Sequence, residues 1–107
     1  METKLQYIPL IQEGEISTGE RVYFEIDEKT VMLFRVGDAY FAVGDVCTHD
    51  DGPLGDSDLE GYELVCPRHG ARFDIRDGKA LCLPAVRPIP SYPVRIHEGM
   101  VEIGIQG

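Results

Sequence analysis

Basic residues are scarce in this chain of 107 residues. Lysine and arginine together number 10, against 19 aspartates and glutamates, and the formal net charge is -9. No segment gathers the basic side chains into the stripe that a nucleic-acid backbone or an anionic membrane requires. We therefore expect neither as a partner. A protein with a basic patch fits better, because opposite charge speeds diffusional encounter; the alternative is that the charge only maintains solubility.

Long hydrophobic runs are also absent. The most apolar stretches, 31–34 and 81–86, fall far short of the roughly 20 residues that cross a bilayer. The first residues, METKLQYIPLIQEGE, lack the apolar core and the small-residue cleavage site of a signal peptide. These two absences predict a cytoplasmic protein without a membrane anchor.

Cysteine and histidine are rare, with 3 residues of each. In a reducing compartment, three cysteines favour metal or redox use over a disulfide framework. The hydrophobic share of 43% and the charged share of 27% are typical of a folded globular protein. Since the chain has the length of one ordinary domain and no linker or repeat, we expect a single domain over 1–107.

Turn-forming dipeptides divide the chain into short runs rich in Val, Ile, Phe and Tyr. Each dipeptide supplies the positive backbone angles that a tight turn needs, so three β-hairpins are predicted. Further strands are expected at 4–9, 21–26 and 63–65, and no window has the apolar spacing of a helix. The predicted fold class is all-β, with small antiparallel sheets that form a barrel or sandwich base and a subdomain at about 45–90. The dipeptides are Gly37-Asp38, Asp77-Gly78 and Glu98-Gly99.

Two short segments each place a cysteine close to a histidine. Cys47 and His49 form a C-x-H pair, Cys66 and His69 form a C-x-x-H pair, and residues 50–65 separate them. Thiolate and imidazole are ligands of soft or borderline transition metals. Two chelating pairs that a hairpin returns to one place would make a four-coordinate site. The sequence therefore predicts a metal centre at these four side chains.

The donor set leaves two kinds of metal centre open. One is a mononuclear zinc site with two sulfur and two nitrogen ligands, and the other is a binuclear iron–sulfur cluster in which two histidines replace two cysteines. The glycines at 52, 55 and 70 would allow backbone amides to approach a bound anionic sulfide. The remaining alternative is that the cysteines are small buried hydrophobic residues and the histidines are incidental, which the presence of both pairs disfavours.

The sequence C-T-H followed by C-P-x-H-G, at this separation in a small β protein, resembles the Rieske family. The resemblance covers about 31–105 and includes G-A-R-F-D at 70–74, a following D-G-K turn, a proline-containing loop and a closing hairpin. It implies the Rieske-like fold and one [2Fe-2S] cluster. By the same resemblance, the cysteines of the two motifs would bind one iron and their histidines the other.

Several positions resemble the low-potential rather than the high-potential members of the family. Gly52 and Arg68 stand where the proteins of cytochrome bc complexes carry two cysteines that form a bracing disulfide. Ala71 and Phe73 stand where those proteins place a serine and a tyrosine hydroxyl against cluster sulfur. Fewer donors to sulfur, together with the aspartates at 50–51, imply a low reduction potential.

The resemblance implies a monomeric ferredoxin of a multicomponent aromatic-ring oxygenase. Such a protein is an electron-transfer component and not an enzyme, because it passes single electrons from a flavin-dependent reductase to a terminal oxygenase. An oxygenase would need a second iron, and only His97, expected at the solvated surface, remains to bind it. Cys82 is expected to be a small packed residue. The alternatives are an assimilatory nitrite reductase small subunit, an auxiliary electron carrier or assembly factor, and a zinc-binding interaction module.

Overall fold

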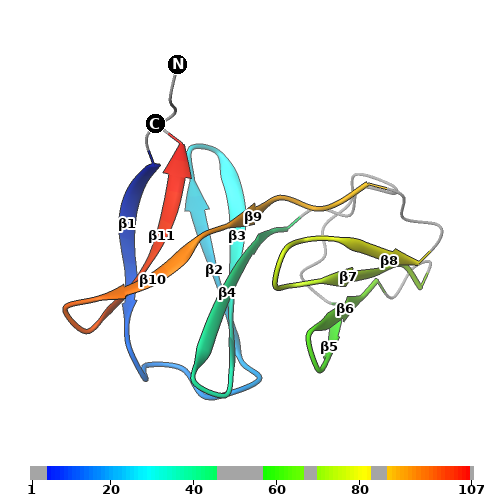
Figure 1. The fold of residues 1–107 in the computed structure, drawn as a ribbon, viewed down its shortest axis with the longest axis horizontal. Coiled ribbons are helices and arrows are strands. Elements are labelled where there is room, and N and C mark those ends of the chain that lie inside the picture. The colour runs from blue at the N-terminus through cyan, green and yellow to red at the C-terminus, as the bar shows by residue number, and fades with distance from the viewer. Residues whose placement is uncertain (1–4, 46–56, 67–69, 83–86, 107) are drawn as a thin grey trace.

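The computed structural model describes residues 5–45, 57–66, 70–82 and 87–106. In these ranges the chain forms eleven β-strands and no helix (Figure 1). The all-β prediction is therefore confirmed. The strands are β1 (Leu5–Gln12), β2 (Arg21–Ile26), β3 (Lys29–Val36), β4 (Ala39–Gly44), β5 (Asp58–Glu60), β6 (Glu63–Val65), β7 (Arg72–Asp74), β8 (Ala80–Cys82), β9 (Ser91–Tyr92), β10 (Val94–His97) and β11 (Met100–Gln106).

The strands form three antiparallel sheets. The terminal sheet has the order β1-β11-β10, and the central sheet has the order β2-β3-β4-β9. The small sheet has the order β5-β6-β7-β8 and lies to one side of the other two (Figure 1). The small sheet falls within the 45–90 region that contains both Cys/His motifs.

The three predicted hairpins are present. Val36 pairs with Ala39 across the Gly37-Asp38 turn, and His97 pairs with Met100 across the Glu98-Gly99 turn. Strands β7 and β8 pair across the segment that contains Asp77-Gly78. The predicted bounds of β2 and β6 are correct, and β1 extends beyond the predicted 4–9.

The sequence reading missed strand β5 and the β2–β3 hairpin. Ile26 pairs with Lys29, so Asp27 and Glu28 form the turn between these strands. Both residues have positive φ, 51° and 66°. An aspartate followed by a glutamate is an unusual choice for this backbone conformation, which glycine or asparagine normally adopts.

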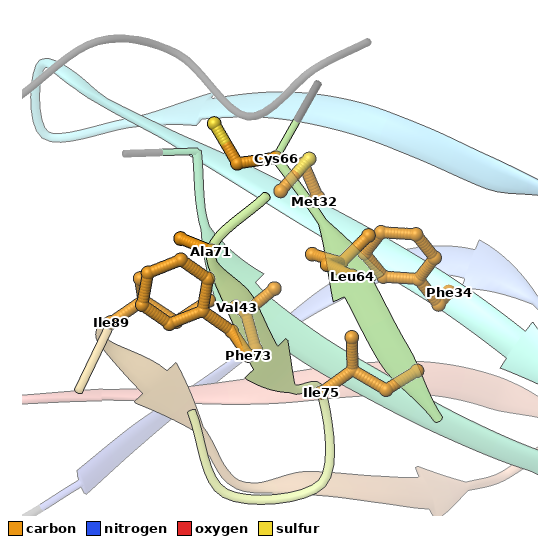
Figure 2. Close-up of a cluster of buried hydrophobic side chains, with 9 residues drawn as sticks. All are labelled: Met32, Phe34, Val43, Leu64, Cys66, Ala71, Phe73, Ile75 and Ile89. Atoms are coloured by element: carbon orange, nitrogen blue, oxygen red, sulfur yellow. The ribbon is translucent and has the colours of Figure 1, made fainter. Parts of the chain in front are cut away.

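Strand β3 is buried on both of its faces. Val31 and Leu33 belong to the hydrophobic cluster between the central and terminal sheets. Met32 and Phe34 belong to a second cluster, which includes inward-facing residues of the small sheet such as Leu64 (Figure 2). Each of these four consecutive residues of β3 is at most 1% exposed.

The small sheet depends on this second cluster. Its strands have only 3 residues each, too short for a stable isolated sheet. Leu64, Phe73 and Ile75 bury their side chains completely or almost completely. Each such residue contributes roughly 1.5–3 kcal/mol on burial. Packing on the central sheet therefore holds the small sheet, and with it the region around Cys66, in place.

Candidate metal centre

Only one of the four predicted ligands lies in the described part of the structure. Cys66 is described, whereas Cys47, His49 and His69 lie outside the described residues. Within the described ranges, no three His, Cys, Asp or Glu side chains gather in a way that could hold a metal ion. The structure therefore informs on the centre through Cys66 and through the strands that lead into both motifs.

Cys66 follows directly after β6 and has a fully buried side chain. It is a free cysteine at the edge of the second hydrophobic cluster, and its sulfur points away from Leu64 and Phe73 (Figure 2). A thiol without a disulfide that is sheltered from water suits a thiolate ligand of an iron–sulfur cluster. The described donor therefore fits the predicted group.

Backbone hydrogen bonds fix both flanks of the second motif. The amide of Cys66 donates to the carbonyl of Ala71 at 2.8 Å, and the amide of Gly70 donates to the carbonyl of Cys66 at 2.8 Å. Gly70 has φ of 72°, a left-handed conformation that glycine adopts without strain. The two described residues that flank the second motif, Cys66 and Gly70, are thus joined by a backbone hydrogen bond.

The entry to the first motif is fixed by strand β4 and the chain around Pro90. The amide of Gly44 donates to the carbonyl of Pro90 at 2.8 Å, and the amide of Asp45 donates to the carbonyl of Thr30 at 3.0 Å. A Cβ atom at Gly44 would lie 3.2–3.3 Å from the Pro90 ring, so glycine permits this close approach. Asp45 is two residues before Cys47.

The D-G-K turn holds the segment that reaches Pro90. The amide of Ile89 donates to the carbonyl of Gly78 at 2.8 Å, and the amide of Gly78 donates to the carbonyl of Asp74 at 2.7 Å. Ile89 is only 2% exposed and belongs to the second hydrophobic cluster. The turn, the Ile89 segment and strand β4 are thus connected by a continuous series of backbone hydrogen bonds.

Asp74 anchors the beginning of this turn through Arg76. Its Oδ1 accepts the backbone amide of Arg76 at 2.9 Å and Nε at 3.0 Å, and its Oδ2 accepts Nη2 at 2.8 Å. The Arg76 guanidinium lies 4.5 Å from the centre of the Tyr62 ring, which in turn forms a T-shaped pair with the Phe41 ring. The hydrogen bond from the Arg76 side chain lowers the pKa of Asp74, although partial burial opposes the shift.

Replacing Asp74 by asparagine is expected to lower stability in a pH-dependent way. Because the pKa of Asp74 is lower in the folded state, its ionised form stabilises the fold above the unfolded pKa. This contribution is lost as the pH falls below about 4. The difference between the urea midpoints of wild type and Asp74→Asn should therefore be largest at neutral pH and should narrow in acid.

The matched control is Asp77→Asn, which removes a nearby carboxylate whose Oδ1 accepts the Lys79 amide. This variant should show a much smaller effect. An Asp74→Asn difference that stays constant from neutral to acid pH would assign the effect to side-chain shape and not to charge.

An ion-pair group crosses the outer face of the small sheet. Arg72 Nη1 lies 3.2 Å from Glu60 Oε1 and 3.3 Å from Glu63 Oε1, so the group joins β7 to β5 and β6. Hydrogen bonds to these two glutamates raise the pKa of Arg72. The side chains are exposed to solvent, and such pairs add little stability. Two carboxylates against one guanidinium leave this group with a net negative charge.

The sequence analysis also singled out His97 and Cys82. His97 is exposed at the end of β10 in the terminal sheet, as predicted. Cys82 ends β8, and its side chain lies outside the described part. Ala71 and Phe73 are both fully buried in the cluster that contains Cys66, and neither brings a hydroxyl group there.

The sequence analysis missed the Gly78–Ile89 contact and the Asp74–Arg76 pair. Both join residues of conspicuous motifs, G-A-R-F-D and D-G-K, but their partners depend on how the chain folds back.

No helix long and apolar enough to cross a membrane occurs in the ranges that the structure describes.

Comparison with known proteins identifies the family of this chain. The model of the Rieske [2Fe-2S] domain family matches residues 6–93. The ferredoxin component of the naphthalene 1,2-dioxygenase system of Pseudomonas putida is 34% identical over 101 residues, which are 94% of this chain and 97% of the relative.

Two solved structures have the same fold. The ferredoxin of Sphingomonas yanoikuyae B1 superposes with a TM-score of 0.82 at 32% identity, covering 94% of this chain and 99% of the other. A complex of reduced oxygenase and oxidised ferredoxin in carbazole 1,9a-dioxygenase gives 0.82 at 26% identity, covering 91% of each chain. This chain therefore belongs to the Rieske [2Fe-2S] domain family.

Proposed function

We propose that this chain is a low-potential ferredoxin that delivers single electrons to the terminal oxygenase of an aromatic-ring dioxygenase system. The observation that carries the proposal is its similarity, over almost the whole of both chains, to the ferredoxin component of such a system. The bound [2Fe-2S] cluster supplies the chemistry, which is the reversible uptake of one electron.

Cys47 and Cys66 bind one iron of the cluster, and His49 and His69 bind the other. Support comes from the spacing of the two motifs and from the buried, disulfide-free thiol of Cys66. The backbone contacts at Gly44 and Ala71 hold the flanks of both motifs, so the ligand loops start from fixed positions. A pre-organised ligand frame keeps the donors in place in both redox states.

The protein environment keeps the reduction potential low. The reduced cluster is the more negative form, so hydrogen-bond donors to its sulfur atoms would favour reduction. Ala71 and Phe73 are buried beside Cys66 without a hydroxyl group, which removes two possible donors. The net charge of -9 also opposes the addition of an electron, although solvent screens it.

The partners are a terminal oxygenase as acceptor and a flavin-dependent reductase as donor. A ferredoxin of this fold occurs in complex with an oxygenase in carbazole 1,9a-dioxygenase, which supports the acceptor. The donor rests on the resemblance between the motifs and those of oxygenase ferredoxins. We further propose that the protein acts as a cytoplasmic monomer, because a carrier that visits two partners in turn must bind each of them transiently.

Anaerobic purification followed by electron paramagnetic resonance of the reduced protein tests the cluster. We expect a coloured protein with equal iron and sulfide content and the spectrum of mixed sulfur and nitrogen ligation. Catalytic amounts of the protein should then restore electron flow from an NADH-dependent flavin reductase to an aromatic-ring oxygenase.

Three results would contradict the proposal. A colourless, zinc-loaded protein would identify a zinc-binding module. Copurification with a large haem-containing partner and support of nitrite reduction would identify a nitrite reductase subunit. A reduced protein that transfers no electrons to any aromatic-ring oxygenase in this assay would exclude an oxygenase as the acceptor.

A further inference from the structure

One buried hydroxyl group has no partner. Ser57 directly precedes β5, is only 1% exposed, and its Oγ makes no hydrogen bond within the described part of the protein. No other buried side-chain nitrogen or oxygen of the described residues is in this state. Leaving a buried hydroxyl unpaired costs about 1–3 kcal/mol. A group of this kind calls for a partner beyond the described residues, such as a bound group.

Extending the β5–β6 register by one residue would set Ser57 opposite Cys66. Asp58 pairs with Val65 in the antiparallel β5–β6 ladder, and one further step in the same register joins Ser57 to Cys66. Side chains of a strand alternate between the two faces of the sheet. Ser57 and Cys66 therefore share the inner face with Leu64, and both are buried there.

The backbone of Cys66 shows which kind of pair this is. Its amide donates to Ala71 and its carbonyl accepts from Gly70, so its polar groups face β7 and not β5. In antiparallel sheets, such non-hydrogen-bonded pairs bring the Cα atoms to about 4.5 Å and the side chains closest together. Ser57, Cys66 and Ala71 thus form one row at the adjoining ends of β5, β6 and β7, with the thiol in the middle and the hydroxyl on one side.

We propose that Ser57 raises the reduction potential of the metal centre by donating a hydrogen bond from its Oγ to the ligand sulfur of Cys66 when the cluster is bound. This inference rests on the proposed role of Cys66 as a ligand. A negatively charged sulfur accepts a stronger hydrogen bond after one electron has been added, so the hydroxyl favours the reduced form. The hydroxyl keeps its proton throughout, and the external reductant supplies the electron. Ser57 is a positioning residue, because it acts through the ligand sulfur.

The test compares Ser57→Ala with Ser57→Thr in the cluster-loaded protein. Loss of the hydroxyl is expected to lower the equilibrium constant for one-electron reduction about fivefold, which at 59 mV per tenfold is a potential lower by about 40 mV. Ser57→Thr keeps the hydroxyl and should retain most of the wild-type potential. In resonance Raman spectra, transfer to deuterated water should shift an iron–sulfur stretching band in wild type, and this shift should be lost in Ser57→Ala.

Stability gives an independent readout. Because the hydroxyl has no hydrogen-bond partner among the residues that the structure describes, Ser57→Ala without the cluster should be at least as stable as wild type in urea. A potential that is unchanged in fully loaded Ser57→Ala would overturn the inference. So would a Ser57→Ala protein that no longer binds the cluster, because that result assigns Ser57 a structural role. Failure of the proposed function would appear earlier, as a wild-type protein without the mixed-ligand resonance.

Discussion

Replacing Cys66 by alanine is expected to abolish cluster binding while leaving the fold in place. Alanine keeps a small apolar side chain at a fully buried position of the hydrophobic cluster, so the packing around it changes little. The thiolate, however, is lost, and no other sulfur occurs beside Cys66 among the described residues of that cluster except the thioether of Met32. Visible absorption and iron content should fall to roughly a tenth of wild type or less, since changes even to groups behind a metal ligand cost 10–100-fold in affinity.

The matched control for this variant is Cys82→Ala. It removes the third cysteine, which belongs to neither motif, and should leave the cluster spectrum unchanged. Far-ultraviolet circular dichroism of both variants checks that the sheets remain. A Cys66→Ala protein with full absorption would show that Cys66 is only a packed core residue.

Gly78→Ala is expected to be the most destabilising small substitution in the D-G-K turn. A Cβ atom at this position would lie 2.1 Å from the carbonyl oxygen of Ile89, and the backbone has φ of 79°. Relief of this clash requires the turn to move away from the Ile89 segment and so breaks the 2.8 Å hydrogen bond between them. Strain and forced repacking together should cost about 3 kcal/mol. The melting temperature should then fall by about 12 °C or more.

Gly61→Ala separates strain from the clash. Gly61 also has positive φ, 62°, but a Cβ atom there would meet nothing within 4 Å. This variant should lose only about 1 kcal/mol, from the left-handed backbone alone. Similar losses of stability in the two variants would mean that the close contact between Gly78 and Ile89 contributes little to stability.

Gly78→Ala should also weaken cluster retention, because the Ile89 segment supports strand β4 through Pro90.

Local signals in the sequence were sufficient for much of the fold. Strands β2 and β6 were predicted with their correct bounds, and the hairpins at Gly37-Asp38 and Glu98-Gly99 were marked by glycine. The β2–β3 hairpin carries no such mark, because its turn uses Asp27 and Glu28 at positive φ. Strand β5 was missed because its 3 residues contain a single apolar side chain.

The candidate site, like the fold, could be predicted from the sequence only in part. The four ligand candidates follow from the spacing of the two motifs, and the family that they resemble is confirmed by the match over residues 6–93. The assignment of the individual ligands stays a prediction. The position of Ser57 opposite Cys66 depends on strand register, and the contact between Gly78 and Ile89 joins segments that meet only after folding. Neither has a signature in a single sequence.

Because β3 is buried on both of its faces, the small sheet and the terminal sheet should unfold together. Separation of the small sheet would expose Met32 and Phe34, whereas separation of the terminal sheet would expose Val31 and Leu33 on the same strand. Partial opening on either side is therefore costly, and the chain should unfold in one cooperative transition. Amide protons of β3 should exchange most slowly of all, with protection close to the global free energy of unfolding.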